Sequence, residues 1–425
     1  MASKTIKDFF GPGRTFNVEL LRYLGPGFLV TVGFIDPGNW ATNIAGGSEF
    51  NYSLLWVISL STLMLIFLQH MSAHLGIVTG TCLAESCRMW FPKSANYLLG
   101  GSIMLACVAT ALAEFLGAAI GFTILFGLPL RVSAIIAGFI ILSLVTVQKY
   151  DQIEHLIISF VSIIGFCYLL ELYLVSPDWG EAVKASVVPK ISSSEIFIAM
   201  GMLGAVVMPH NIYLHSEVIQ RRNWKAVTEE RKRQLLRYEF TDTLLAMGTG
   251  WMINSAMVIV AAAVFFKNGV LVTDINQAAE TLRPLAGTLA ELVFAVALIC
   301  AGISSSITAC LAGGTVFTGY LGKEIDPQKT WFRGGVFLTA VPAIIIIMFL
   351  GDTYKALIWS QVILSMQLPL TIIPLIILTR SRKVMGVYAN GRFENLLLYV
   401  CGGIIISLNV LLLLSFFGVD FSMLK

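Results

Sequence analysis

Residues 33–44 read GFIDPGNWATNI, and residues 205–216 read AVVMPHNIYLHS. Each stretch carries an x-Pro-x-Asn motif inside an apolar run, as DPGN at 36–39 and as MPHN at 208–211. A proline in a helix removes a backbone donor and clashes with the carbonyl one turn earlier. The two motifs therefore predict two interrupted helices. Irregular backbone survives at membrane depth only where it is buried or lines a cavity.

The composition indicates that the chain crosses a membrane many times. Of its 425 residues, 57% are hydrophobic and only 12% are charged, about half the charged fraction of a soluble protein. A spanning helix needs about 20 mostly apolar residues. Eleven such runs are present, with approximate limits 23–46, 53–77, 97–126, 132–148, 155–175, 195–219, 240–266, 286–321, 334–350, 356–379 and 394–418. The sequence therefore predicts an all-α polytopic membrane protein.

The two motifs occupy equivalent positions in the predicted helix order. Each lies in the first helix of a five-helix set, in residues 23–175 and 195–379. Because five is odd, the second set enters the membrane from the opposite side, which is the pattern of an inverted-topology repeat. We expect the interruptions to face each other near the bilayer midplane, where such transporters bind substrate. The span at 394–418 lies outside the repeats.

The distribution of positive charge predicts the orientation. Most of the 28 Lys and Arg residues fall on one side of the predicted map, seven of them between Arg221 and Arg237. Loops on the opposite side are relatively acidic, with Asp178, Glu181, Asp274 and Glu280. The positive-inside rule then places segment 1–22 in the cytoplasm and the C-terminus outside. The start of the chain lacks the features of a signal peptide, and we expect a multi-pass protein of the plasma (inner) membrane.

The residues at the interruptions predict a cation site. Proline frees carbonyl groups from Gly33 onward in the first motif and from Ala205 onward in the second. Asp36 adds a carboxylate, Asn39 an amide oxygen and Met208 a thioether. An ionised Asp at membrane depth costs roughly 2.5–3.5 kcal/mol on insertion scales and normally has a functional partner. The alternatives are that Asp36 only caps the following half-helix and that Met208 only packs in the core.

The thioether bears on which ion is bound. Mg²⁺ and Ca²⁺ prefer a shell made only of oxygen, whereas Mn²⁺, Fe²⁺ and softer ions such as Cd²⁺ accept sulfur. Met208 therefore favours a transition metal over the abundant alkaline-earth ions.

Several motifs resemble one known family. DPGN followed by WATNIAGG, MPHNIYLHS, LGIVTG (75–80), LAEFLGAAIGF (112–122), AGISSSIT (301–308) and SQVILS (360–365) resemble the Nramp family of proton-coupled divalent metal transporters. The resemblance implies a LeuT-type fold of five plus five helices, with an eleventh helix outside the repeats. It implies a metal between Asp36, Asn39, the Ala205 carbonyl and Met208. It also implies that Gln361 approaches the metal, although a bond to a neighbouring helix is an equal interpretation.

The resemblance also implies a proton pathway. Glu114, His210 and His215 match acidic and histidine residues that couple metal entry to proton entry in the family. A histidine suits this role because its unperturbed pKa lies near physiological pH. The chain departs from the family pattern at three places, with Ala111 where an Asp is common, Gly314 where a Gln is usual and Thr318 where a polar or acidic residue often follows. These departures predict weakened or rerouted coupling.

Other chemistry-bearing residues receive simpler interpretations. We expect His70, His74, Glu154, His155 and Asp242 to be interfacial, and Glu171 and Glu291 to be solvated near the outer surface. The seven cysteines lie mostly in apolar runs without CxxC spacing, and we expect buried thiols, not a disulfide framework or a zinc site.

The sequence predicts a monomeric, non-enzymatic importer of Mn²⁺, Fe²⁺ or Cd²⁺-like ions by alternating access, with some proton coupling. Its partners are the metal ion as substrate, protons and the lipid bilayer, with no cofactor and no nucleic acid. One alternative is an uncoupled or Mg²⁺-type transporter, against which Met208 argues. A sodium-coupled amino-acid carrier is disfavoured because Asp36 would repel a substrate carboxylate. A membrane metalloenzyme or metal sensor is disfavoured because HExxH and similar ligand sets are missing.

Overall fold

A computed structural model describes residues 25–147, 150–192, 194–222, 228–275 and 288–416. Within these residues the regular structure is helical, with no β-strand. The helices are α2 (Pro26–Thr31), η2 (Val32–Ile35), α3 (Pro37–Phe50), α4 (Leu55–Thr79), α5 (Leu83–Trp90), α6 (Lys93–Phe126), α7 (Leu130–Val147), α8 (Tyr150–Leu174), α9 (Trp179–Val187), α10 (Ile196–Val206), α11 (Pro209–Val218), η3 (Ile219–Arg222), α12 (Glu229–Val264), η5 (Phe266–Asn268), α14 (Thr288–Leu321), α15 (Thr330–Phe349), α16 (Thr353–Arg380), α17 (Arg382–Met385), η6 (Gly386–Tyr388) and α18 (Arg392–Phe416).

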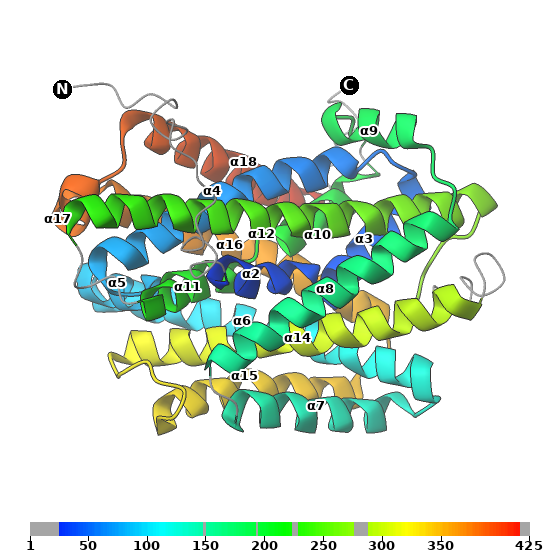
Figure 1. Cartoon of the computed structure of the whole chain (residues 1–425), viewed down its shortest axis with the longest axis horizontal. Coiled ribbons are helices and arrows are strands. Elements are labelled where there is room, and N and C mark those ends of the chain that lie inside the picture. Colours follow the sequence, from blue (N-terminus) through cyan, green and yellow to red (C-terminus); the bar gives the residue numbers. More distant parts are fainter. Residues whose placement is uncertain (1–24, 148–149, 193, 223–227, 276–287, 417–425) are drawn as a thin grey trace.

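The long helices form a bundle in which α4, α12, α6 and α14 run roughly along one direction (Figure 1). Ten helices of the described residues are long and apolar enough to cross a membrane. The first predicted span is not among these ten helices, because it is divided into the shorter helical segments Pro26–Ile35 and Pro37–Phe50. The prediction of an all-α polytopic membrane protein is confirmed. The predicted segment 1–22, and the outermost residues of several predicted spans, fall outside the described residues.

Each motif interrupts its helix at the residue before the proline. Asp36 is extended, with φ −72° and ψ 162°, and α3 begins at Pro37. Met208 is also extended, with φ −81° and ψ 122°, and α11 begins at Pro209. The proline ring disfavours helical geometry for the preceding residue, while its own fixed φ suits the first position of a new helix. The two interruptions therefore have the same local cause.

Small residues bring α6 close to two other elements. A Cβ atom on Gly302 of α14 would lie 2.4 Å from the backbone nitrogen of Ala118 in α6. A Cβ atom on Gly117 of α6 would lie 2.0 Å from Cβ and Cγ of Pro37. Glycine at helix contacts permits such approach of one backbone to another. Helix α6 therefore packs directly against both α14 and the first interruption.

Four polar residues that we expected to be interfacial or solvated are buried, namely Glu171, Asp242, His70 and His74. The exposed fraction is 2% for Glu171, 1% for Asp242 and 7% for His70, so the prediction is wrong for them. Asp242 accepts hydrogen bonds from the backbone nitrogens of Gly25 at 3.1 Å and Gly27 at 2.7 Å. Nδ1 of His70 lies 2.6 Å from Oε2 of Glu239. Hydropathy alone missed these partners because they lie on other helices.

His74 is also buried, at 8% exposed, whereas His155 is exposed as expected. The prediction that the cysteines are buried thiols is confirmed. All seven lie in the described part of the chain, and each is a free, buried thiol.

Candidate functional site

The Asp36 carboxylate lies at the N-terminus of α3. Oδ1 accepts a hydrogen bond of 2.9 Å from the backbone nitrogen of Asn39, and Oδ2 accepts one of 3.2 Å from that of Gly38. Asp36 therefore caps α3, as one interpretation of the sequence expected. Capping fixes the direction of the carboxylate, and leaves lone pairs on both oxygens because a carboxylate offers about four acceptor positions. The cap and a cation site are compatible.

Asn39 connects the two interruptions. Its Nδ2 atom donates to the carbonyl oxygen of Phe34 at 2.6 Å and to that of Ala205 at 2.8 Å. Its Oδ1 atom is buried without a hydrogen-bond partner among the described residues. The freed carbonyls of both half-helices thus converge on one amide group, whose oxygen remains available.

Met208 and Asn211 line the second interruption. Met208 is fully buried, and Nδ2 of Asn211 lies 3.7 Å from its sulfur. A Cβ atom on Gly33 would lie 1.9 Å from Nδ2 of Asn211, so Gly33 gives the Asn211 side chain its space. Asn211 was not among the predicted ligands, although the repeated x-Pro-x-Asn motif contained the signal.

Gln361 reaches the first interruption from α16. A Cβ atom on Gly38 would lie 1.7 Å from Nε2 of Gln361 and 2.9 Å from Oδ2 of Asp36. Nε2 of Gln361 donates to Oγ of Ser360 at 3.0 Å. Its Oε1 atom is buried and lacks a partner within the described residues. Gln361 is therefore placed beside the N-terminus of α3.

The side chains around the interruptions are fully buried, and some of their acceptor oxygens have no hydrogen-bond partner among the described residues. Asp36, Asn39, Ala205, Met208 and Gln361 are all 0% exposed. Buried polar groups are nearly always hydrogen-bonded, and an exception calls for an explanation such as an ion. In the described chain, Oδ1 of Asn39 and Oε1 of Gln361 are such exceptions. Uncompensated acceptor oxygens beside a carboxylate form an environment that a cation would stabilise.

Two of the predicted proton-pathway residues, Glu114 and His210, are buried near this cluster. Glu114 lies one turn before Gly117, which packs on Pro37. Oε1 of Glu114 accepts a hydrogen bond of 3.2 Å from Oγ1 of Thr110. Oε2 of Glu114 has no partner in the parts of the chain that the structure describes, and the same holds for both ring nitrogens of His210.

His215 belongs to a different contact. Its Nδ1 atom lies 3.1 Å from Oε1 of Gln69 on α4, while Nε2 lacks a partner within the described ranges. Sequence reasoning did not identify Gln69, because nothing in the local sequence shows which helix faces α11.

The structure shows the surroundings of the three residues that depart from the family pattern. Ala111 is fully buried on α6, one turn before Glu114, and places a methyl group there. A Cβ atom on Gly314 would lie 2.6 Å from Cε1 of Phe332, so the Phe332 ring fills the space that a longer side chain would need. Thr318 is fully buried, and its hydroxyl has no partner among the described residues.

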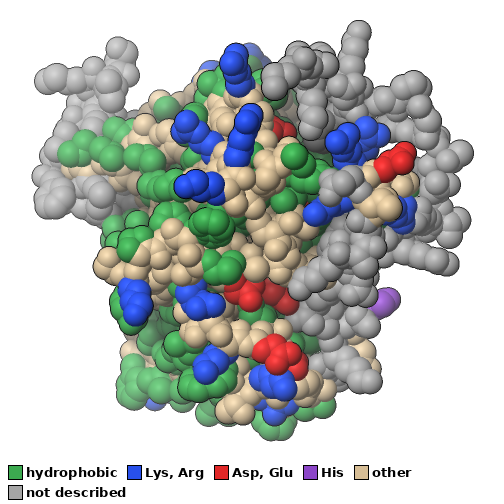
Figure 2. All heavy atoms as spheres, turned by 90° about the vertical axis from the view of Figure 1, so that its left-hand side faces the viewer, with side chains coloured by type: hydrophobic (Ala, Val, Ile, Leu, Met, Phe, Trp, Pro, Cys, Tyr) green, Lys and Arg blue, Asp and Glu red, His purple; other side chains and the backbone are tan. Residues whose placement is uncertain are grey.

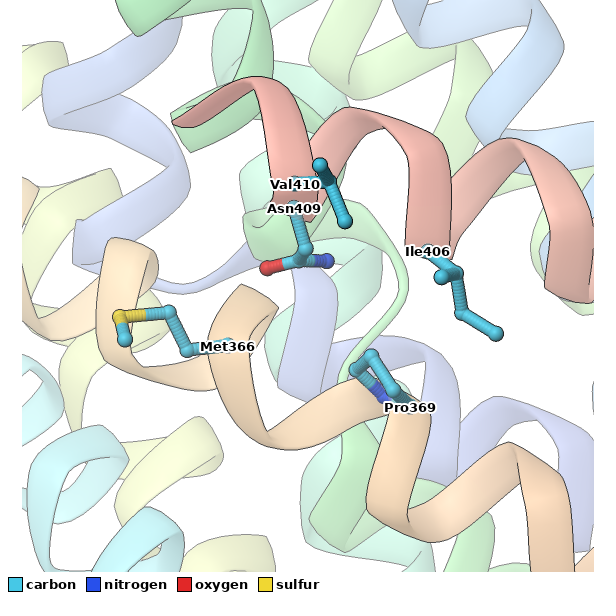
Figure 3. A pocket seen from close by; sticks show the side chains of 5 residues that line it. All are labelled: Met366, Pro369, Ile406, Asn409 and Val410. Atoms are coloured by element: carbon cyan, nitrogen blue, oxygen red, sulfur yellow. The ribbon is translucent and has the colours of Figure 1, made fainter. Parts of the chain in front are cut away.

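A separate cavity of about 200 Å³ lies between α16 and α18. Met366 and Pro369 of α16 and Ile406, Asn409 and Val410 of α18 border it (Figure 3). None of these residues belongs to the predicted site. The cavity is therefore a gap beside the last helix, and the candidate site is the polar cluster between α3, α10, α11 and α16.

These features define a polytopic α-helical membrane protein with a buried polar site between two interrupted helices. The chain belongs to the Nramp family, because the family model described as natural resistance-associated macrophage protein-like matches residues 27–415.

Relatives and solved structures agree with this assignment. The chain is 42% identical over 398 residues to the divalent metal cation transporter MntH of Caldanaerobacter subterraneus, covering 93% of each. It is 40% identical to MntH of Brucella suis, covering 93% of this chain and 89% of that protein. The manganese transporter of Eremococcus coleocola superposes with a TM-score of 0.80 at 28% identity, covering 94% of this chain and 88% of the other. The transporter Mhp1 shares the fold, with a TM-score of 0.63 at 16% identity over 91% of each chain.

Proposed function

We propose that this protein imports divalent transition-metal ions, Mn²⁺ or Fe²⁺ with Cd²⁺ as a related substrate, by alternating access. The observation that carries the proposal is the gathering of Asp36, Asn39, the Ala205 carbonyl and Met208 at two joined helix interruptions, fully shielded from solvent. The names of the relatives, divalent metal cation transporter and manganese transporter, support the same function.

In this proposal the ion is the substrate. It binds between the interruption that precedes α3 and the interruption that separates α10 from α11. Asp36 supplies charge, Asn39 an amide oxygen, Ala205 a carbonyl and Met208 a thioether. The backbone at Gly33 lines the site, and Gln361 contributes its Oε1 atom, which has no hydrogen-bond partner among the described residues. The mixed oxygen and sulfur donors favour Mn²⁺, Fe²⁺ and Cd²⁺ over Mg²⁺, which argues against the Mg²⁺-type alternative.

Transport requires the site to open alternately to the two sides. We infer that residues 23–175 and 195–379 act as two repeats that move against each other around the ion, with 394–418 outside them. Asp242 accepts hydrogen bonds from the backbone nitrogens of Gly25 and Gly27 at the start of α2. Release of these bonds would free α2 to move.

We infer that Glu114, His210 and His215 carry protons during transport. Glu114 and His210 have buried atoms without partners in the described part of the chain, and such groups can accept or release a proton without first breaking a hydrogen bond. Ala111 removes one acidic group from the pathway, so we infer weak coupling. We also propose that the protein works as a monomer, since each chain contains both halves of the site.

We propose that the protein lies in the plasma (inner) membrane with its N-terminus inside. One end of the bundle, where α5 ends and α6, α15 and α18 begin, carries many basic side chains. Figure 2 shows Lys and Arg spread over this end. Exposed basic residues there include Arg88, Lys93, Lys323, Lys329, Arg380, Arg382, Lys383 and Arg392. A basic end supports a cytoplasmic assignment by the positive-inside rule.

The test is ion-competition uptake in proteoliposomes, with and without an imposed pH gradient. We expect saturable Mn²⁺ uptake that Fe²⁺ and Cd²⁺ inhibit and that excess Mg²⁺ and Ca²⁺ leave unchanged. Uptake inhibited equally by Mg²⁺ would contradict the proposed substrate class. Uptake insensitive to the pH gradient would contradict only the proton coupling.

A further inference from the structure

A groove between α16 and α18 is open to the outside of the helix bundle. Its widest part is the cavity of about 200 Å³ near Pro369, where side chains of the two helices border a common space (Figure 3). Met366, Ile406 and Val410 line this cavity and are 43%, 40% and 48% exposed. Because both helices are long and apolar enough to cross a membrane, the groove faces lipid.

The local sequence accounts for the groove. Proline is a usual cause of a bend in a helix, and Pro369 lies inside α16. Gly402 of α18 faces α16, since a Cβ atom there would lie 3.4 Å from Cδ1 of Ile376. Gly403 is exposed, and a Cβ atom there would have no neighbour within 4 Å. Gly403 precedes Ile406 by three residues on the same face of α18, so the missing side chain lengthens the groove beyond the cavity.

An apolar stripe follows α16 from the cavity to the end of the helix. Met366, Leu370, Ile373 and Ile377 succeed one another at spacings of three or four residues, which places them on one face. Met366, Ile373 and Ile377 are exposed, and Leu370 is partly exposed. The same spacing then reaches Arg380, which is also exposed. The stripe therefore joins an apolar cavity to a positive charge.

The distance from the cavity to the end of α16 matches one leaflet of a bilayer. Pro369 precedes Arg380 by 11 residues, which is about 16 Å at 1.5 Å per residue. The hydrocarbon core is about 30 Å thick, so one leaflet takes up about 15 Å. An acyl chain whose headgroup lies beside Arg380 therefore ends at the level of the cavity.

Arg380 joins α16 to α18 at the mouth of the groove. Its Nη1 atom donates a hydrogen bond of 2.6 Å to the hydroxyl of Tyr399, and both side chains are exposed. Tyrosine is enriched where the membrane meets water. A guanidinium group has five donors, so Arg380 keeps others with which to hold a phosphate group.

The surrounding chain is basic. Arg382 and Lys383 of α17 and Arg392 at the start of α18 are exposed and add three positive charges to that of Arg380. Between residues 380 and 394 the sequence has one acidic residue, Glu394. We call Arg380, Arg382, Lys383 and Arg392 the basic corner. Basic pockets between membrane helices attract anionic lipid headgroups.

We propose that the groove between α16 and α18 binds an anionic phospholipid. Its phosphate group lies against Arg380 and the basic corner, and one acyl chain follows the apolar stripe into the cavity. The charge of the corner selects the headgroup, while the length and apolar lining of the groove suit the chain.

The test is a lipid titration of the purified full chain in detergent, read by native mass spectrometry. The probes are phosphatidylglycerol and phosphatidylcholine with the same acyl chains. We expect the first phosphatidylglycerol to bind about 5-fold more tightly than the first phosphatidylcholine, or better. Arg380→Gln should weaken phosphatidylglycerol binding by about 5-fold and leave phosphatidylcholine unchanged. Lys93→Gln, at an exposed position at the start of α6, is the matched control and should bind as the wild type does.

A second set of variants tests the groove itself. Val410→Trp places a large ring in the cavity and should weaken both lipids by about 5-fold or more, the loss of contact with one or two methylene groups. Val400→Trp is the matched control, because Val400 is 49% exposed on the same helix and does not line the cavity. Asn409→Leu should bind lipid at least as tightly as the wild type. Nδ2 of Asn409 already donates to the Ile405 carbonyl oxygen at 2.9 Å, and an acyl chain offers its Oδ1 atom no donor.

Three results would overturn the proposal. Equal binding of the two lipids, or equal losses in Arg380→Gln and Lys93→Gln, would reduce the basic corner to a diffuse effect of charge. Full-strength binding by Val410→Trp would show that the acyl chain does not enter the cavity. Loss of lipid binding in Asn409→Leu would indicate a polar occupant, such as a helix of a second copy of the chain.

A smaller change repeats the headgroup test should Arg380→Gln fold poorly. Tyr399→Phe removes only the hydroxyl that orients Arg380. It should weaken phosphatidylglycerol binding and leave phosphatidylcholine binding unchanged. Unchanged binding of both lipids by Tyr399→Phe and Arg380→Gln would place the headgroup elsewhere.

Discussion

Asn39 and Ala205 are 166 residues apart and are joined by a hydrogen bond of 2.8 Å from Nδ2 of Asn39 to the Ala205 carbonyl oxygen. This bond crosses from the half-helix that begins after the first interruption to the half-helix that ends before the second. It brings together the two pieces of chain from which we build the metal site.

Asp36→Asn should reduce saturable Mn²⁺ uptake by about 100-fold or more, because it removes the only full negative charge among the proposed ligands. Asn retains a side-chain oxygen that can cap α3, so the helix should still form. The matched control is Asp352→Asn, since the exposed Asp352 caps α16 in the same way, through a 3.0 Å bond from the backbone nitrogen of Lys355. Asp36→Ala should also abolish uptake, and rapid uptake by either folded Asp36 variant would refute the site.

Met208→Ala should weaken Cd²⁺ and Fe²⁺ binding more than Mn²⁺ binding, because sulfur matters most to the softer ions. It should also admit Mg²⁺ and Ca²⁺, since the remaining donors are oxygens. Isothermal titration calorimetry with each ion measures the effect. Equal losses for all ions, without any gain for Mg²⁺ or Ca²⁺, would show that the thioether does not set selectivity.

His210→Ala should leave measurable Mn²⁺ flux while reducing the acidification of the liposome lumen that accompanies it. Glu114→Ala should do the same, because a cation at Asp36 favours deprotonation of its neighbours. A fluorescent pH reporter inside Mn²⁺-fed proteoliposomes compares both variants with the wild type. Acidification at full strength in both would place the proton path elsewhere.

Gly117→Ala should lower stability by roughly 1–3 kcal/mol, the usual cost of overpacking, because the new methyl group would lie 2.0 Å from the rigid Pro37 ring. Gly101→Ala is the matched control on the same helix, with no atom within 4 Å of the new Cβ. It should be neutral or stabilising by up to about 1 kcal/mol. Thermal unfolding in detergent distinguishes the two. Equal melting temperatures would contradict the tight contact between α6 and Pro37.

Cys87 on α5 should resist alkylation at neutral pH in the folded protein. Burial raises the pKa of the Cys87 thiol to about 12, and the protonated thiol is a poor nucleophile. Reactivity should therefore rise only as the pH approaches that value or as the protein unfolds. Maleimide labelling followed by mass spectrometry measures it, with Ser94→Cys, at a nearby exposed position, as the reactive control. Rapid labelling of native Cys87 at pH 7 would contradict its burial.

The sequence by itself determined the helical membrane fold and the place of both interruptions. Apolar runs of sufficient length and prolines beside polar residues are local signals, since they act on the backbone within one or two turns. The same signals identified Asp36, Asn39 and Met208 as candidate ligands. They could also have identified Asn211, the last residue of the second motif.

Only the tertiary structure decided which helices face each other. Glu171, Asp242 and His70 lie near the ends of apolar runs, and hydropathy predicted them to be interfacial or solvated. Asp242 instead meets the start of α2, and His70 meets Glu239 of α12. Glu171 is enclosed by residues of α3, α12 and α14. Burial of a polar side chain depends on contacts between residues far apart in the chain, and periodicity within one helix carries no information about its partner.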